Sequence, residues 1–382
     1  MLIGKCKVSL KDRGTEVGGS MRIGIGVAGS LLAGGRPRIA VAGILAASLL
    51  AACGSSSSSS STSTTAAAGS TTTASAPVSV TLAKAINTEP FATANVAQAL
   101  GYFKAGNLNV KIETVAGSSV ANAALQSGSV QFVLASSAAL LLAAAKNIPL
   151  LAVGGIDKGD GVQLVVSNSW IKAHNLSASM PLAERIKGLE GTTLATLSTS
   201  DKSVMQDFLS TENVPASTVK DVSMSSAAAQ LAAVQHGLAQ EFIASPPNSS
   251  IAVAGGYGTV LANAKELPYL SDEAYDILIT TPAYAKAHPA VVKAMVGAFQ
   301  KAISAMSQQT PAAITAMQPL YPTLTPAVIK SSLTSITFTP TMQQTQIGWN
   351  DALTFAQKTD LVKPGQSLDV SEGSVWTNQF SG

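Results

Sequence analysis

The sequence predicts an α/β protein with two doubly wound lobes, which are joined by two extended crossings and separated by a ligand cleft. From Val78 onward, short β-branched runs alternate with Ala-rich helical windows. Near-continuous apolar strands that alternate with helices are typical of parallel βαβ units. This alternation occurs twice, along a chain long enough for one large or two closely linked domains.

The first lobe is predicted to begin with residues 77–165. Its strands are β-branched or continuous apolar runs, expected at Val78–Ile86, Val110–Val115, Val130–Ala135 and Pro149–Gly154. Ala- and Leu-rich windows between them predict helices at Ala92–Lys104, Val120–Gln126 and Ala138–Lys146. The crossovers are short, as expected for a doubly wound sheet.

The second lobe is predicted over residues 166–275, after an extended run at Val162–Ser167. The same criteria place its strands at Thr192–Leu197, Val219–Met224, Glu241–Ala244 and Tyr257–Leu261. They place its helices at Lys202–Glu212 and Ala227–His236.

Residues 276–382 are predicted to return to the first lobe and to add C-terminal helices. Ile277–Thr280 is an extended run that would make the return crossing. The strongest helix is Pro289–Met306, in which Met295, Phe299 and Ile303 belong to one apolar face at 3.6-residue spacing.

Residues 1–52 have the pattern of a signal peptide. The apolar run Ile39–Ala52 follows Arg36 and Arg38. A membrane-spanning helix needs roughly 17–25 apolar residues, so this shorter run is better suited to a signal-peptide core. Met21 is an alternative start to Met1, and the sequence does not decide between them.

The end of this run, Leu50–Cys53 (LAAC), resembles a bacterial lipobox. The resemblance implies that Cys53 becomes lipidated and holds the protein at the extracytoplasmic face of the cell membrane. An ordinary signal peptide, or a short anchor helix that ends at a cysteine, is the alternative. Residues 53–76 are almost wholly Ser, Thr, Ala and Gly and cannot bury enough surface to fold, so they predict a flexible tether.

Composition excludes several functions for the body of the chain. Without residues 1–52, it has 17 Lys and Arg against 19 Asp and Glu, and Arg185 is its only arginine. A near-neutral body without a basic stripe argues against nucleic-acid binding. Cys6 and Cys53 are the only cysteines, so the body has no disulfide, thiol nucleophile or cysteine-based metal site. We therefore expect no cofactor, metal or catalytic residue.

Read in order, the segments resemble the solute-binding proteins of nitrate/sulfonate/taurine-type ABC transporters, a family that includes binders of thiamine precursors. The resemblance covers roughly Val78 to Ala356 and rests on AQALGYF (97–103), NLNV (107–110), LQSGSV (125–130), LEGTTL (189–194), QHGLAQ (235–240) and FIASP (242–246). Ser129 stands where the family often has aspartate, and the usual basic pair near Leu189 is missing. This chain is therefore a divergent member.

The resemblance implies a periplasmic-binding-protein-like fold whose lobes close over a small polar or anionic solute, such as a sulfonate, a nitrate-like anion or a heterocycle. It implies an ABC permease and its ATPase as partners, and a monomer. Ligand contacts are implied in four loops, at Asn87, Thr88 and Phe91, at Ser136 and Ser137, at Ser198, Thr199, Ser200 and Asp201, and at Pro246 and Asn248.

Each of these positions has a structural alternative. Phe91 could pack in the core, since most aromatic side chains do. Ser136, Ser137 and Asn248 could be ordinary helix caps. Gly154–Asp160 could be a fifth contact or a flexible connection at the hinge. Two other functions stay open, a sensory lipoprotein without a permease and an exported enzyme on the same fold. His174, His236 and His288 are isolated, which argues against the enzyme.

Overall fold

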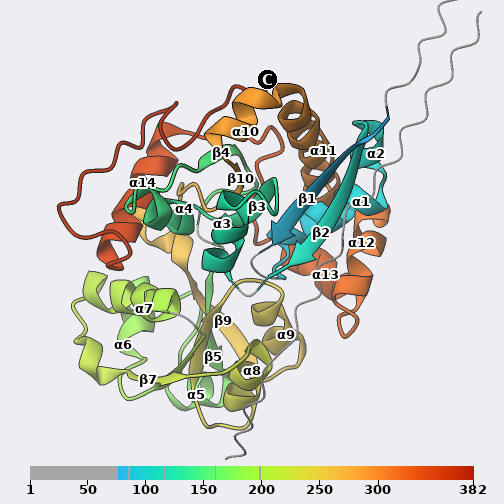
Figure 1. Ribbon diagram of the computed structural model, residues 1–382. Coiled ribbons are helices and arrows are strands. Elements are labelled where there is room, and N and C mark those ends of the chain that lie inside the picture. Colours follow the sequence, from blue (N-terminus) through green and yellow to red (C-terminus); the bar gives the residue numbers. More distant parts are fainter. Residues whose placement is uncertain (1–75, 85–86, 116, 160, 198) are drawn as a thin grey trace, which may run out of the picture. The chain divides into compact units, whose positions relative to one another are not determined.

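The computed structural model describes residues 76–84, 87–115, 117–159, 161–197 and 199–382, with Thr199 and Ser200 described by their backbone alone. It contains two five-stranded sheets, each covered by helices on both faces (Figure 1). The predicted α/β fold with two lobes is confirmed. The predicted signal peptide, tether and lipidated Cys53 lie outside the described residues, as does Ser198.

The first sheet has the strand order β2-β1-β3-β10-β4. Its strands are β1 (Val78–Lys84), β2 (Leu108–Thr114), β3 (Phe132–Ser136), β4 (Leu151–Gly155) and β10 (Asp276–Thr280). β1 pairs in parallel with β2 and β3, whereas β10 is antiparallel to β3 and β4.

The second sheet repeats this plan with the order β7-β6-β8-β5-β9. Its strands are β5 (Gln163–Ser167), β6 (Thr193–Thr196), β7 (Lys220–Ser223), β8 (Glu241–Ala244) and β9 (Gly258–Asn263). β6 is parallel to β7 and β8, and β5 is antiparallel to β8 and β9.

The predicted parallel βαβ units therefore account for three strands of each sheet, while β5 and β10, predicted only as extended runs, pair antiparallel. Each of these two strands enters its sheet directly from the other lobe. The parallel strands end towards the other lobe, so a strand that arrives from there must run in the opposite direction. The antiparallel strand is thus a consequence of crossing twice between the lobes.

The helices of the first lobe are α1 (Thr93–Ala99), α2 (Tyr102–Ala105), α3 (Ser118–Gln126), α4 (Ser137–Ala144), α10 (Pro282–Ala287), α11 (Pro289–Ser307), α12 (Pro311–Met317), α13 (Pro326–Leu333) and α14 (Gln346–Lys358). The predicted helix Ala92–Lys104 is in fact α1 and α2, because Gly101 adopts φ 73° and interrupts it. Beyond Lys358 the chain forms turns without a further helix, contrary to the expected mostly helical terminus.

The helices of the second lobe are α5 (Asn168–Ala173), α6 (Leu182–Lys187), α7 (Thr199–Thr211), α8 (Ala227–Gln235) and α9 (Asn248–Ala254). The sequence reading missed α5, α6 and α9, which have six, six and seven residues and so show little periodicity. No helix in the described part of the chain is long and apolar enough to cross a membrane.

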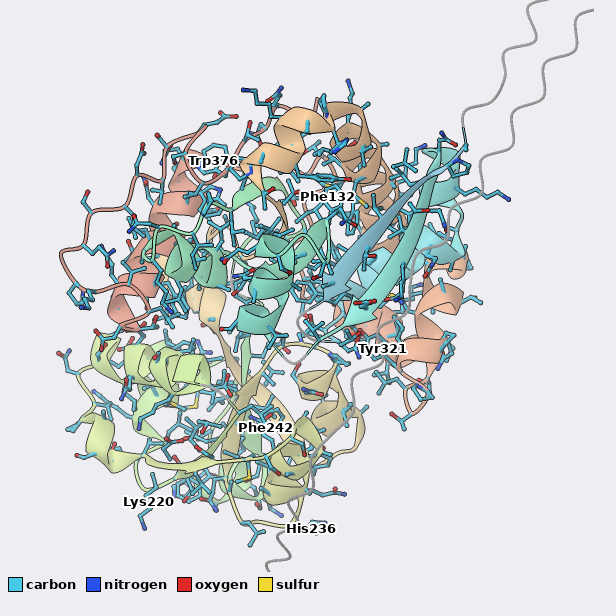
Figure 2. All side chains as sticks on the ribbon, in the orientation of Figure 1. Phe132, Lys220, His236, Phe242, Tyr321 and Trp376 are labelled. Carbon is cyan, nitrogen blue, oxygen red and sulfur yellow. The ribbon has the colours of Figure 1, made fainter. Side chains whose placement is uncertain are left out.

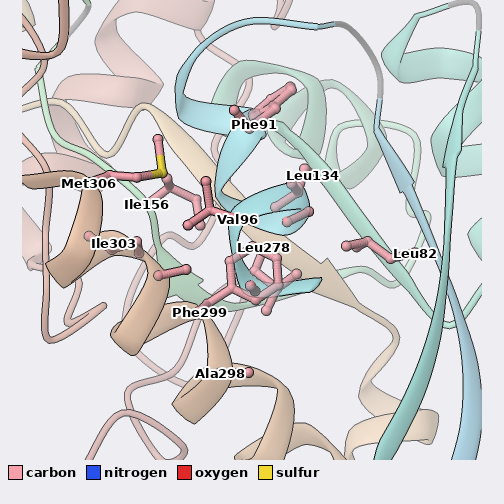
Figure 3. Packing of buried hydrophobic residues seen from close by; sticks show 14 of the residues in the cluster. Leu82, Phe91, Val96, Leu134, Ile156, Leu278, Ala298, Phe299, Ile303 and Met306 are labelled. Carbon is pink, nitrogen blue, oxygen red and sulfur yellow. The ribbon is translucent and has the colours of Figure 1, made fainter. Parts of the chain in front are cut away.

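Alternating side chains of the first sheet build two separate cores. Leu82, Leu134 and Leu278 face α1 and α11, where Phe299 and Ile303 pack against them (Figure 3). The residues between them, such as Val133 and Ile277, face α3, α4 and α14. Both faces are buried because successive residues of a strand point to opposite sides.

The second sheet is covered in the same way. Leu164, Leu194 and Ile243 pack against α6 and α7. Phe242 lies on the opposite face, inside the lobe, with α8 and α9 (Figure 2). The same figure places Lys220 and His236 at the outer end of this lobe.

Two crossings connect the lobes and lie side by side. The backbone N–H of Ile156 donates to Asp276 O at 2.8 Å, and that of Gly159 donates to Glu273 O at 2.7 Å. Gly159 has φ +70°, and a Cβ there would lie 2.5 Å from Ser271 O, so this close approach requires glycine. Paired crossings of this kind permit a hinge motion of one lobe relative to the other.

Candidate functional site

A cavity of about 530 Å³ lies between the two sheets and is lined from both lobes. This volume is within the range of small-molecule sites in proteins. The first lobe contributes Thr88, Phe91, Gly117, Ser118, Ser136, Ala138 and Phe355. The second lobe contributes Leu197, Asp201, Val204, Ile243, Ala244, Ser245 and Asn248, and the crossings add Val162, Tyr275 and Asp276.

The strand topology explains why these residues meet. Ser136 ends β3, Leu197 follows β6 and Ser245 follows β8. The carboxyl ends of parallel strands share one edge of a sheet, and in open α/β sheets ligands bind at that edge. Here the two such edges face each other, so the loops of both sheets enclose one space.

A second hollow, of about 760 Å³, lies on the first lobe alone. It follows α11 and α12 and is lined by residues such as Gln300 and Thr310. Because it touches a single lobe, closure of the hinge cannot enclose it. The interlobe cavity is therefore the stronger candidate for a ligand site.

Five of the residues that the sequence singled out line the cavity: Thr88, Phe91, Ser136, Asp201 and Asn248. Asn87 is exposed on the same loop and does not line it. Thr199 and Ser200 begin α7, with side chains outside the described part of the structure.

Ser137 and Pro246 lie beside the cavity without lining it. Ser137 is fully buried, and its hydroxyl donates to Glu273 Oε1 at 3.5 Å. Pro246 is also buried, and its carbonyl accepts from the backbone N–H of Glu89 at 3.5 Å. This second bond joins a loop of one lobe to a loop of the other.

The structural alternatives are answered differently at each position. Ser136 is the N-cap of α4 and accepts from the N–H of Ala139 at 3.3 Å. Asn248 is the first residue of α9, and the N-cap is Pro247, so Asn248 is not the cap. Phe91 is 1% exposed and belongs to the core, although it also lines the cavity. The described residues of Gly154–Asp160 lie in β4 and the first crossing and do not line the cavity.

Tyr275 and Asp276 line the cavity and were not among the predicted contacts, whereas Asp201 belongs to the predicted segment 198–201. Asp201 lies in the first turn of α7, and its Oδ2 accepts from the N–H of Leu197 at 2.7 Å. A carboxylate in the first turn of a helix is a signal that the sequence did contain. Asp276 could not be found in this way, because it reaches the cavity only through the pairing of β10 with β3.

Glu89, next to Thr88 in the chain, is a buried carboxylic acid at the contact between the lobes. Burial raises its pKa to about 7, and a hydrogen bond from Ser332 opposes this rise. Ser332 Oγ lies 2.5 Å from Glu89 Oε1 and 2.8 Å from Ile329 O. A hydroxyl has one proton to donate, so a protonated Glu89 that donates to Ser332 satisfies both contacts.

Among the described residues, the cavity is lined by no histidine and by no group of metal ligands. No group of three or more His, Cys, Asp and Glu side chains there could hold a metal ion. His174 stacks on Trp170 with ring centroids 3.9 Å apart, His288 lies 4.6 Å from Tyr284, and His236 ends α8. None of these histidines lines the cavity.

Comparison with known proteins identifies the family to which this chain belongs. The family described as NMT1/THI5 like matches residues 89–313, so this chain belongs to that family. The match begins in the first cavity loop and ends within α12, and it includes every strand of both sheets except β1. A search of the curated proteins found no match.

Solved structures show that the fold is that of the periplasmic binding proteins. The aliphatic sulphonate binding protein SsuA of Escherichia coli is 17% identical, with a TM-score of 0.60 over 75% of this chain and 91% of that chain. SsuA of Xanthomonas axonopodis pv. citri, bound to MOPS, is 19% identical, with a TM-score of 0.57 over 76% and 96%. The nitrate-binding protein NrtA of Synechocystis PCC 6803 is 13% identical, with a TM-score of 0.53 over 76% of this chain and 83% of that chain.

Proposed function

We propose that this chain is the extracytoplasmic solute-binding component of an ABC importer. In this role it captures a small molecule between its lobes and delivers it to a permease and that permease's ATPase. The observation that carries the proposal is the cavity itself, which is lined from both lobes at the carboxyl ends of their strands. The structural similarity to sulphonate- and nitrate-binding proteins supports the same role.

Capture requires that the ligand prefer the closed form. A ligand shifts a conformational equilibrium only by its differential affinity for the two states. Ser136 on one lobe and Asn248 on the other both line the cavity, so a solute that contacts both binds fully only when the lobes are together. The bond from Glu89 N–H to Pro246 O adds a direct contact between the lobes.

The N-terminal sequence supports a proposal for the location of the protein. We propose that residues 1–52 are removed as a signal peptide, that Cys53 is lipidated, and that residues 53–76 tether a monomeric body to the membrane surface. The lipobox-like LAAC and the Ser/Thr-rich segment support this. A tether of about 23 flexible residues has an end-to-end distance on the order of 25 Å, enough to lift the body off the headgroups.

The lining of the cavity narrows the range of ligands that the sequence suggested. Sulfonate-, nitrate- and heterocycle-like solutes were all compatible with the resemblance. The cavity lining is largely apolar, with residues such as Phe91, Val204 and Ile243. Such a lining favours an organic solute with an apolar body over a compact oxyanion.

The proposal is tested by thermal denaturation of the full chain against fractions of a metabolite extract. A solute at a hundredfold excess over its dissociation constant should stabilise the protein by about 2.7 kcal/mol. Ser245→Trp fills the cavity from the second lobe and should abolish this stabilisation. Ser331→Trp, at an exposed position of α13, is the matched control and should retain it. Equal stabilisation of both variants would exclude the cavity as the binding site.

A further inference from the structure

The charges around the cavity have one sign. Asp201 lines it from the second lobe and Asp276 from the return strand of the first. The lining contains no lysine, arginine or histidine among the described residues. The residues of the body that the structure leaves undescribed, 85, 86, 116, 160 and 198, are Ala, Ile, Ala, Asp and Ser, so none of them can add a positive side chain.

The basic side chains nearest in sequence to the cavity loops, Lys84, Lys158 and Lys202, have other partners, as does Arg185. Lys202, next to Asp201 in α7, pairs with Asp221 Oδ2 at 3.3 Å. Lys84, at the end of β1, is 2% exposed and donates to Asn95 Oδ1 at 2.7 Å. Lys158, on the first crossing, pairs with Asp272 Oδ1 at 2.6 Å on the surface. Arg185, the only arginine of the body, donates to Leu261 O and pairs with Glu266. Among the described residues, the cavity lining therefore supplies no cation for an anionic ligand.

Helix N-termini at the cavity could attract an anion instead, but the protein's own groups already occupy two of them. The Ser136 hydroxyl accepts from an N–H of the first turn of α4. Asp201 places a carboxylate in the first turn of α7. An anionic ligand at α7 would meet this negative charge at close range, which opposes the effect of the helix dipole.

We propose that the ligand is a small organic cation, an amine or amidine carried on an apolar body. This inference rests on the proposed function and specifies its solute. The apolar part of the ligand packs against Phe91, Val204 and Phe355, and the positive group lies between Asp201 and Asp276. Because these two carboxylates belong to different lobes, a cation attracts both and stabilises the closed form.

The register of the first sheet supports Asp276 as a ligand contact. Asp276 is paired with Ser136 across β10 and β3, so a hydroxyl acceptor lies beside this carboxylate. Tyr275 and Asn248 line the same cavity and add further polar atoms. The lining therefore offers several acceptors to an N–H-rich group, which has more than one proton to donate.

The test compares headgroups on a constant apolar body. Isothermal titration of the full chain uses 2-phenylethylamine, cyclohexylmethylamine and tryptamine, each beside the corresponding alcohol, carboxylate and sulfonate. The amine of at least one series should bind tenfold or more tightly than its anionic counterparts. Asp201→Asn and Asp276→Asn should each weaken that amine tenfold or more. Asp369→Asn, at an exposed turn outside the cavity, is the control and should leave it unchanged.

Three results would overturn the assignment of charge: tighter binding of a carboxylate or sulfonate, unchanged amine affinity in both cavity variants, or no binding by any amine. The proposed function is tested by a separate experiment. It survives if the metabolite-extract screen yields a ligand that Ser245→Trp excludes, whatever the charge of that ligand. It fails if no such ligand is found.

Discussion

The two sheets follow the same plan, yet the lobes around them differ in size and in what their edges contact. Each sheet has three neighbouring parallel strands, then an antiparallel strand from the other lobe, then an edge strand. The first lobe adds α10–α14, and two large cores bury its sheet. In the second lobe, all four residues of the edge strand β7 are exposed. The first lobe therefore surrounds its sheet with more helices than the second lobe does.

The lobes are nevertheless joined by packing as well as by the crossings. Phe355 of α14 is 3% exposed and packs in the core of the second lobe with Phe208. Lys358 of the same helix pairs with Asp207 of α7 at 3.1 Å. Through α14, the C-terminal part of the chain is therefore a component of both lobes.

The largest effect is expected from core truncation in either lobe. Phe299→Ala in the first lobe and Phe208→Ala in the second remove fully buried rings and should each cost about 3–5 kcal/mol. If α14 couples the lobes, either variant should shift the unfolding of both in one transition. Urea denaturation measures this, with Trp349 and Trp376 reporting on the first lobe and Trp170 on the second. Two separated transitions would show that the lobes are independent.

A buried glutamate lies beside a hydroxyl in each lobe, Glu89 in the first and Glu241 in the second, and these two can be compared directly. Burial raises the pKa of Glu241 in the second lobe to about 8. Thr192 Oγ1 lies 2.7 Å from Glu241 Oε1 and 2.6 Å from Leu189 O, the same arrangement as Ser332 with Glu89. In both lobes, therefore, the neutral acid is the form that fits.

Glu241→Gln should remove a pH-dependent loss of stability on the order of a few kcal/mol. The folded-state pKa lies above the unfolded value of 4.5, so the folded protein retains a proton that the unfolded chain loses. Stability of the native sequence should fall as pH rises from about 4.5 to about 8, and the variant should be the more stable of the two at pH 8. Urea denaturation of both proteins at pH 4.5 and pH 8 measures their free energies of unfolding. An equal change with pH in the two proteins would mean that folding does not raise the pKa of Glu241.

Glu89→Gln should have a smaller effect of the same sign, between pH 4.5 and about 7, because the shift of its pKa is smaller. The two glutamates should differ in their effect on binding. Neither glutamate lines the cavity, but Glu89 follows the lining residue Thr88 and donates its backbone N–H to Pro246 of the other lobe, whereas Glu241 begins β8. Ligand affinity measured from pH 5 to pH 8 should respond to Glu89→Gln only. A response to Glu241→Gln of equal size would contradict this distinction.

The smallest effect is expected at Lys358→Met. Lys358 is 44% exposed and Asp207 is 11% exposed, so solvent screens the pair. Its loss should cost less than about 1 kcal/mol, because partly exposed ion pairs contribute little. Chemical denaturation in low and high salt measures this cost, which should shrink as salt increases. A cost above 3 kcal/mol would show that this pair is a principal connection between the lobes.

Local patterns in the sequence were sufficient for the core of the fold. Glu241–Ala244 was predicted with its observed bounds, and Pro289–Met306 within one residue of α11. The sequence also contains a local signal for three further helix starts. α10, α12 and α13 each begin with Pro after a threonine N-cap, at Thr281, Thr310 and Thr325. Such Thr-Pro pairs mark helix starts that weak periodicity does not.

The site was less predictable for a physical reason. Thr88 and Ser136 could be found because they follow strands, and strand ends converge at one edge. Asp276 and Phe355 reach the cavity through contacts with residues more than a hundred positions away. Pairing at that distance depends on the direction of β10 and the position of α14, which no local pattern specifies.

Hydrogen exchange with and without the best ligand from the titration panel tests the central claim most directly. The account predicts new protection at the loops that enclose the cavity in both lobes, residues 87–91, 117–118, 136–138, 197–204, 243–248 and 275–276. Protection confined to one lobe, or located along α11 and α12, would contradict the proposal that the lobes close over a solute.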